Sequence, residues 1–132
     1  MRHGIRDHQP RSGGSSAMVT ADDIRAVASS LPRTEEALVR DQVKFRVGRI
    51  VYLALSRDEL SMGFGFPKDE RAALVAADPE KFFMPIQSDL RYNWVRVWLD
   101  AIDQTEMREL VIDAWRMVVP KRAAAEYLGD HP

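Results

Sequence analysis

The stretch QVKFRVGRIVYLALSRDELSMGFGF (residues 42–66) decides the fold, because much of it alternates between two kinds of side chain. From residue 43 to residue 47, apolar residues alternate with Lys44 and Arg46, which is the period of a strand with one apolar and one basic face. A two-residue link, Gly48-Arg49, follows, and a glycine in its first position suits a type II′ turn. The pattern predicts a β-hairpin into residues 50–55.

A third strand follows the polar turn at residues 56–59. Met62, Phe64 and Phe66 alternate with Gly63 and Gly65, so the second face of this strand carries almost no side chains. A bare glycine face lets another group approach closely. A packed helix is the first interpretation of that group, and a ligand is the alternative.

Helical patterns surround these strands. Thr20 and Asp23 have the spacing of a capping box and predict a helix over residues 21–30. Residues 68–77 form a second, short helical segment. A third helix begins near Asp103, carries an apolar stripe that includes Trp115, and is interrupted at Pro120 before residues 121–128 resume the helical composition.

Residues 92–99 complete the pattern as a further strand, with Val95, Val97 and Leu99 on one face. Residues 82–86 read as an apolar loop against the sheet. Strands in sequence followed by separate helices predict an α+β fold, with an antiparallel sheet of about four to five strands covered by helices. Residues 1–17 read as a disordered N-terminal tail, and residues 18–132 as one domain.

Composition excludes several classes of function. The 132 residues contain no cysteine, and all three histidines (His3, His8 and His131) lie near the ends of the chain. Thiolate chemistry, a His-based triad and a zinc site are therefore not expected, nor is any cofactor. No apolar run approaches the ~20 residues of a membrane span, so we expect a cytoplasmic protein without a membrane partner.

Several short motifs, taken together, resemble the MmcQ/YjbR family. They are Leu31-Pro32-x-Thr34-Glu35-Glu36, Lys44-Phe45-Arg46-Val47-Gly48, Asp78-Pro79-x-x-Phe82-Phe83, Trp94-Val95-Arg96-Val97, and Ala114-Trp115-Arg116 with Pro120-Lys121-Arg122. The resemblance covers residues 19–128. It implies a frataxin-like α+β fold and DNA binding through a double-wing arrangement of strands and loops.

Two details qualify this resemblance. Family members often carry glycine before the Trp-Val-Arg-Val strand, where this chain has Asn93, which tolerates positive φ better than most residues. Frataxin-like proteins also suggest iron binding by an acidic ridge on the first helix. Here that helix offers only Asp22 and Asp23, whose position favours a role at the helix terminus, so no metal is expected.

A local excess of basic residues is the strongest functional feature. We expect these residues to contact the phosphates of DNA without reading its sequence. Without the tail, the chain has 16 basic and 19 acidic residues, so such binding would be weak. The alternative is a solvated strand face whose charges prevent edge aggregation. The candidate residues are Arg40, Lys44, Arg46, Arg49, Arg57, Lys121 and Arg122.

Aromatic residues suggest a second function, a module that binds a protein or a small ligand. Tyr92, Trp94 and Trp98 provide a stacking surface, and Arg96 shares a face with the two tryptophans. The alternative is that they cover a small core. Carboxylates gather at helix starts, where capping explains them, so no catalytic residue and no enzymatic activity are expected.

Overall fold

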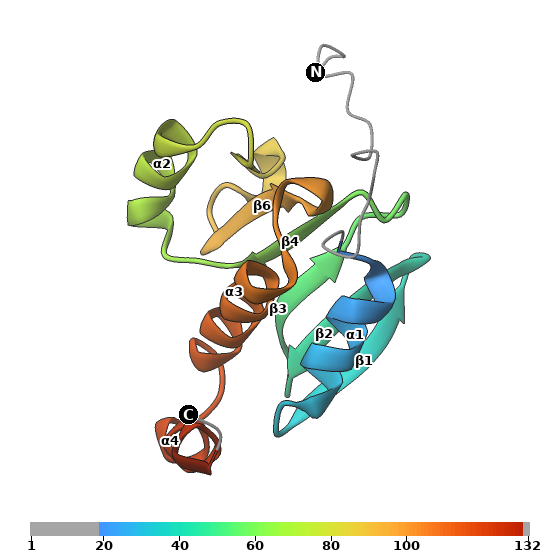
Figure 1. The fold of residues 1–132 in the computed structure, drawn as a ribbon, viewed down its shortest axis with the longest axis vertical. Helices are drawn as coiled ribbons and strands as arrows, with labels where there is room; N and C mark the ends of the chain where they lie inside the picture. Colours follow the sequence, from blue (N-terminus) through green and yellow to red (C-terminus); the bar gives the residue numbers. More distant parts are fainter. Residues whose placement is uncertain (1–18, 131–132) are drawn as a thin grey trace.

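The computed structural model describes residues 19–130, an α+β arrangement of six strands and four α-helices (Figure 1). The predicted tail, residues 1–17, lies outside the described residues. In chain order the elements are α1 (Ala21–Ser30), β1 (Thr34–Val39), β2 (Gln42–Val47), β3 (Ile50–Leu55), β4 (Ser61–Gly65), α2 (Lys68–Ala77), β5 (Phe82–Phe83), β6 (Trp94–Trp98), α3 (Gln104–Arg116) and α4 (Lys121–Asp130), with short 3-10 turns at Gln87–Asp89 and Leu99–Ala101.

The six strands form one sheet in the order β1-β2-β3-β4-β6-β5, in which all neighbours are antiparallel. The α+β prediction is therefore confirmed, with a strand count slightly above the expected four to five. The predicted hairpin is present, since Val47 pairs with Ile50 across a turn in which Gly48 has a φ of 61°. Residues 82–83, expected within a loop, form β5 at the sheet edge.

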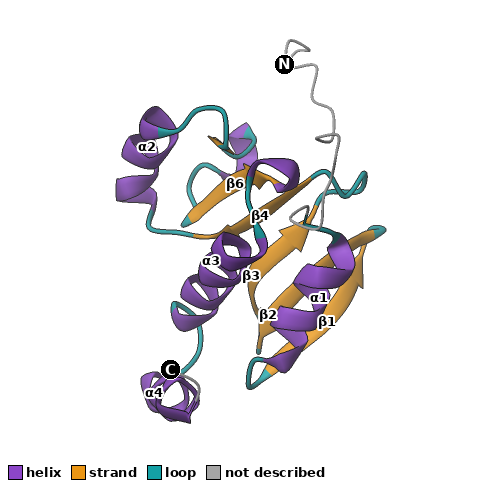
Figure 2. Ribbon diagram, in the orientation of Figure 1, coloured by secondary structure: helices purple, strands orange, loops and turns teal. Residues whose placement is uncertain are grey.

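The alternation of side chains along each strand assigns the residues to the two faces of the sheet. Phe45, Leu53, Phe64 and Val95 form one row across β2, β3, β4 and β6, and all four are buried. Helices α1 and α3 lie across the sheet in front of it (Figure 2). Trp115 of α3 is fully buried, as its helical phase predicts, and its indole N–H donates to the Pro32 carbonyl at 2.9 Å.

A register shift turns Tyr52 into this core. Leu53 pairs with Phe45 and Val51 with Arg46, so Tyr52 has no partner on β2, as in a β-bulge. Its ring is fully buried, and its hydroxyl lies 2.8 Å from the hydroxyl of Thr34. Burial raises the pKa of Tyr52 to about 12.

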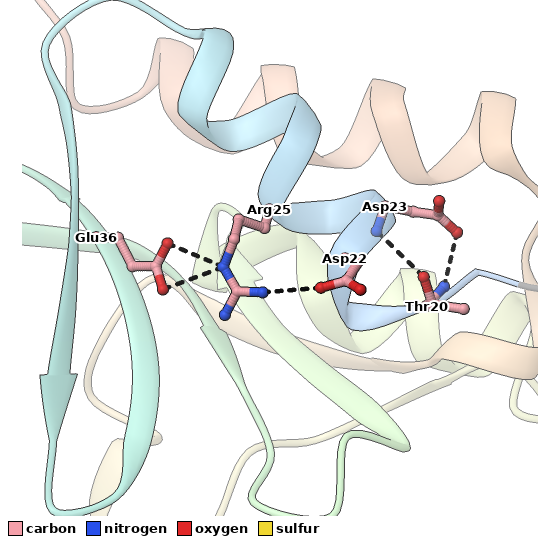
Figure 3. Close-up of polar contacts among 5 residues, drawn as sticks. All are labelled: Thr20, Asp22, Asp23, Arg25 and Glu36. Carbon is pink, nitrogen blue, oxygen red and sulfur yellow. Dashed lines mark hydrogen bonds and ion pairs between the residues drawn. The ribbon is translucent and has the colours of Figure 1, made fainter.

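The predicted capping box begins α1 (Figure 3). The Thr20 hydroxyl accepts from the Asp23 amide at 3.1 Å, and the Asp23 carboxylate accepts from the Thr20 amide at 2.9 Å. Arg25 then joins two elements, since it contacts Asp22 on α1 and Glu36 on β1, each at 3.0 Å. Both acidic residues at this helix start are thus engaged within the protein, in keeping with the predicted terminal role.

Candidate functional site

One row of residues crosses the sheet on the face opposite the buried row. Lys44 on β2 pairs with Ala54 on β3, Ala54 with Gly63 on β4, and Gly63 with Arg96 on β6. Since strands lie about 4.8 Å apart, the Cα atoms of Lys44 and Arg96 are separated by about 14 Å. The two positions between them carry a methyl group and a hydrogen, and the Trp94 indole lies over the second of them.

A hollow of about 750 Å³ has Lys44, Ala54 and Arg96 of this row among its lining residues. Lys44 and Arg49 line it from the β2–β3 hairpin, and Tyr92, Trp94 and Arg96 line it from β6 and the preceding loop. The remaining lining residues are Gln42, Ile50, Val51, Tyr52, Ala54, Gly65, Asp89, Asn93, Met117 and Val118. The hollow therefore brings together members of both predicted residue sets, the basic one and the aromatic one.

Arg96 is a half-buried cation within this hollow. Its guanidinium donates to the Ser61 hydroxyl at 2.8 Å and lies 5.6 Å from the centre of the Phe83 ring. Within residues 19–130 it makes no other hydrogen bond and no ion pair, although a guanidinium carries five N–H donors. Burial lowers the pKa of Arg96, and the charges of Asp89 and Asp58 partly offset this. A desolvated cation with unused donors is suited to an anionic ligand.

Trp94 fills the space that the missing Gly63 side chain leaves. A Cβ built on Gly63 would lie 2.5 Å from the indole Nε1 and 2.7 Å from Cε2 and Cζ2. The group over Gly63 is therefore an indole from the neighbouring strand, and the helix expected there is found at Gly65, which faces Ala114 and Met117 of α3. Within the described part of the chain, the Trp94 N–H has no hydrogen-bond acceptor.

A buried arginine, which no sequence pattern indicates, holds the loop before β6. Arg71 of α2 is 7% exposed, and it donates to the carbonyls of Leu90, Tyr92 and Trp94. A cation inside a short helix usually indicates a solvent-facing position, so only the loop carbonyls reveal its role. Arg71 fixes the backbone that presents the two aromatic residues to the hollow.

Asn93 has a function different from the one expected. It is absent from the described residues with positive φ, so its tolerance of a left-handed backbone is not used here. Its side-chain carbonyl accepts from the Lys68 amide at 3.0 Å and caps α2, whose N-cap residue, Pro67, offers no side-chain bond. The side chain of Lys68 donates to the Arg91 carbonyl at 3.1 Å.

The predicted basic cluster is divided by the structure. Arg46 lies 3.4 Å from the Glu35 carboxylate, opposite it on β1, and Arg57 donates to the Arg40 backbone carbonyl at 2.8 and 3.2 Å. Lys44 and Arg49 remain in the hollow, without an ion pair among residues 19–130. Lys121 and Arg122 are exposed at the start of α4 and do not line the hollow.

The predicted aromatic surface is also divided. Trp98 is 6% exposed and stacks on Phe83, with ring centres 4.5 Å apart, so it offers little surface to a partner. Tyr92 is 51% exposed beside the Arg91 guanidinium, and Trp94 is half-buried at the hollow. Only Tyr92, Trp94 and Arg96 of this set come together there.

Within residues 19–130, no three His, Cys, Asp or Glu side chains gather in a way that would hold a metal ion. Over the same range, no helix has both the length and the apolar character that a membrane span requires.

The fold and the hollow together define an α+β protein with a cationic and aromatic depression, which is lined by β2, β3, β6, the loop before β6 and the residues after α3. A model of the YjbR family matches residues 29–117, so the chain belongs to that family. The crystal structure of Deinococcus radiodurans protein DR2400, with domain DUF419, is similar at a TM-score of 0.68 and 24% identity, over 85% of this chain and 89% of that one. No curated protein matches the sequence.

Proposed function

We propose that this protein is a non-enzymatic binding module that binds DNA weakly and without reading its sequence, with the hollow as its site. One observation carries this proposal: a single depression contains Lys44, Arg49 and Arg96 beside the aromatic rings of Tyr92 and Trp94. Phosphate binding requires cations, and unstacked bases bind to aromatic faces.

The charges available at the hollow support weak binding. Lys44 and Arg49 are unpaired within residues 19–130, whereas Arg46 and Arg57 are engaged by other groups of the protein. Asp89 also lines the hollow and opposes an anionic ligand. Few phosphates are therefore neutralised, and affinity depends on few released counterions.

A protein or small-ligand partner at the same aromatic residues is the second candidate. The observation that favours it is Tyr92, which is half exposed next to the half-buried Trp94. The salt dependence of binding distinguishes the two candidate functions, because phosphate contacts weaken steeply as the salt concentration rises and aromatic contacts do not.

Fluorescence anisotropy with a labelled DNA strand tests the proposal directly. The variant Lys44→Glu/Arg49→Glu places the charge change in the hollow, and the matched control Lys121→Glu/Arg122→Glu makes the same change on α4. We expect the first to lose at least about tenfold in affinity at low salt and the second much less. Equal losses in the two variants would show that net charge, and not the hollow, determines binding.

A further inference from the structure

We infer that the hollow accommodates one unpaired nucleotide, with its phosphate bound by the lining cations Lys44 and Arg96 and its base against Trp94, so that the protein prefers single strands to duplexes. This inference rests on the proposed function and specifies the form of nucleic acid that the site accepts.

The phosphate position follows from the row across the sheet. Lys44 and Arg96 lie at the two ends of the row through Ala54 and Gly63, with their Cα atoms about 14 Å apart, and both line the hollow. The Trp94 indole lies over Gly63 within that distance, so the two long side chains reach a phosphate beside the indole. Arg96 keeps most of its donors unused within the described residues, so a phosphate oxygen satisfies groups that burial otherwise leaves without partners.

The base position follows from Trp94. Its indole is held against the backbone of Gly63, where no Cβ fits, and its strand is fixed through the bond from Arg71 to the Trp94 carbonyl. A ring held in this way loses little freedom when a base stacks on it. Its N–H has no acceptor among residues 19–130.

The size of the hollow determines the preference for single strands over duplexes. A volume of about 750 Å³ lies within the range of about 300–1,000 Å³ that small-ligand sites have. That space suits a single nucleotide and is too small for a duplex. A base pair keeps both bases stacked inside the double helix, so a duplex reaches Trp94 only by flipping a base out of its stack. Single strands do not carry that energetic cost.

Three probes test this inference at equal salt concentration. They are a thymidine oligonucleotide, its duplex with an adenosine strand, and free thymidine monophosphate. We expect the single strand to bind at least about tenfold more tightly than the duplex and to quench tryptophan fluorescence. Trp94→Leu should weaken single-strand binding about 5- to 100-fold, as the loss of one stacked base predicts, and should leave duplex binding nearly unchanged.

Trp94→Phe is the companion variant in case Trp94→Leu folds poorly, because it keeps an aromatic ring at the site. It should retain most of the strand preference and lose the fluorescence quenching. The inference is contradicted if the duplex binds as tightly as the single strand, or if the Trp94 variants weaken both equally.

The same experiment separates this inference from the proposed function. If neither strand form binds, the proposed function fails. If the duplex binds as well as the single strand and the Lys44→Glu/Arg49→Glu variant weakens both, the proposed function stands and the single-strand inference fails. If the mononucleotide binds as tightly as the oligonucleotide, the site takes an unpaired nucleotide as inferred, but its ligand is a free nucleotide and the proposed DNA function is wrong.

Discussion

Lys44 and Arg96 occupy the same row of the sheet, on β2 and β6, with only Ala54 and Gly63 between them. These two cations, which lie 52 residues apart in the sequence, thus line a common hollow. The hairpin that contains Lys44 and the strand that contains Arg96 each have an ordinary amphipathic pattern. Their combination across the sheet produces the site.

Replacement of Gly63, which lies between these cations in the row, should destabilise the protein more than replacement of its neighbours. Gly63→Ala puts a Cβ within 2.5–2.7 Å of the Trp94 ring, so the indole must move. We expect a loss of about 1–3 kcal/mol in the free energy of unfolding, measured by urea denaturation. Gly65→Ala is the matched control, since its nearest neighbours lie 3.7 Å away, and it should be nearly neutral. Equal losses in the two variants would contradict the close packing of the Trp94 indole on Gly63.

Arg71 should matter for stability and for binding. Arg71→Met leaves the carbonyls of Leu90, Tyr92 and Trp94 without their donor in a partly buried setting, at a cost of about 2–4 kcal/mol. DNA affinity should fall as well, because the loop before β6 loses its anchor. Lys68→Met, which removes one bond from an exposed side chain, should cost less than about 1 kcal/mol. A loop that keeps its structure in Arg71→Met, seen as unchanged near-ultraviolet circular dichroism, would contradict the anchoring role.

A gain in binding is expected when Arg46 is released from its ion pair. Glu35→Gln removes the carboxylate 3.4 Å from Arg46, whose side chain shares the sheet face of Lys44. We expect DNA affinity at low salt to rise about two- to fivefold. Glu36→Gln makes the same change in charge on the opposite face, where the carboxylate pairs with Arg25, and should alter binding little. An equal rise in both variants would indicate a general charge effect.

The titration of the Tyr52 phenol tests whether this residue is buried in the core. Its folded pKa of about 12 lies above the value of about 10 for an unfolded chain. Burial of the neutral phenol therefore contributes stability that is fully present below pH ~10 and is lost as the pH rises through the folded pKa. Phenolate absorbance should show a late titration step that Tyr52→Phe removes. If the late step persists in that variant, the assignment to Tyr52 is wrong.

Local patterns predicted the elements that depend on near neighbours. The capping box of Thr20 and Asp23, the hairpin at Gly48 and the buried phase of Trp115 all follow from spacing along the chain. Strand β1 escaped prediction because TEEALV does not alternate, and because its turn to β2 uses Arg40 and Asp41 at positive φ (53° and 67°) in place of glycine or asparagine.

The site was predictable only in part, because it depends on register across four strands. Lys44, Arg49, Trp94 and Arg96 were each identified from the sequence, yet in two separate hypotheses that the register of the sheet unites. The ion pair of Arg46, the carbonyl contact of Arg57 and the burial of Trp98 all arise from residues distant in sequence. Arg71 was missed for the same reason.

The most direct test of the account is a heteronuclear NMR titration of the labelled protein with a thymidine oligonucleotide. The three tryptophans supply three indole N–H signals, of which that of Trp94 lies at the hollow and that of Trp115 is bonded to Pro32. We expect the Trp94 indole signal and the amides of residues 44, 49 and 96 to shift, while the Trp115 signal stays in place. Shifts confined to α4 or to β1, with the Trp94 signal unmoved, would contradict the assignment of the hollow as the binding site.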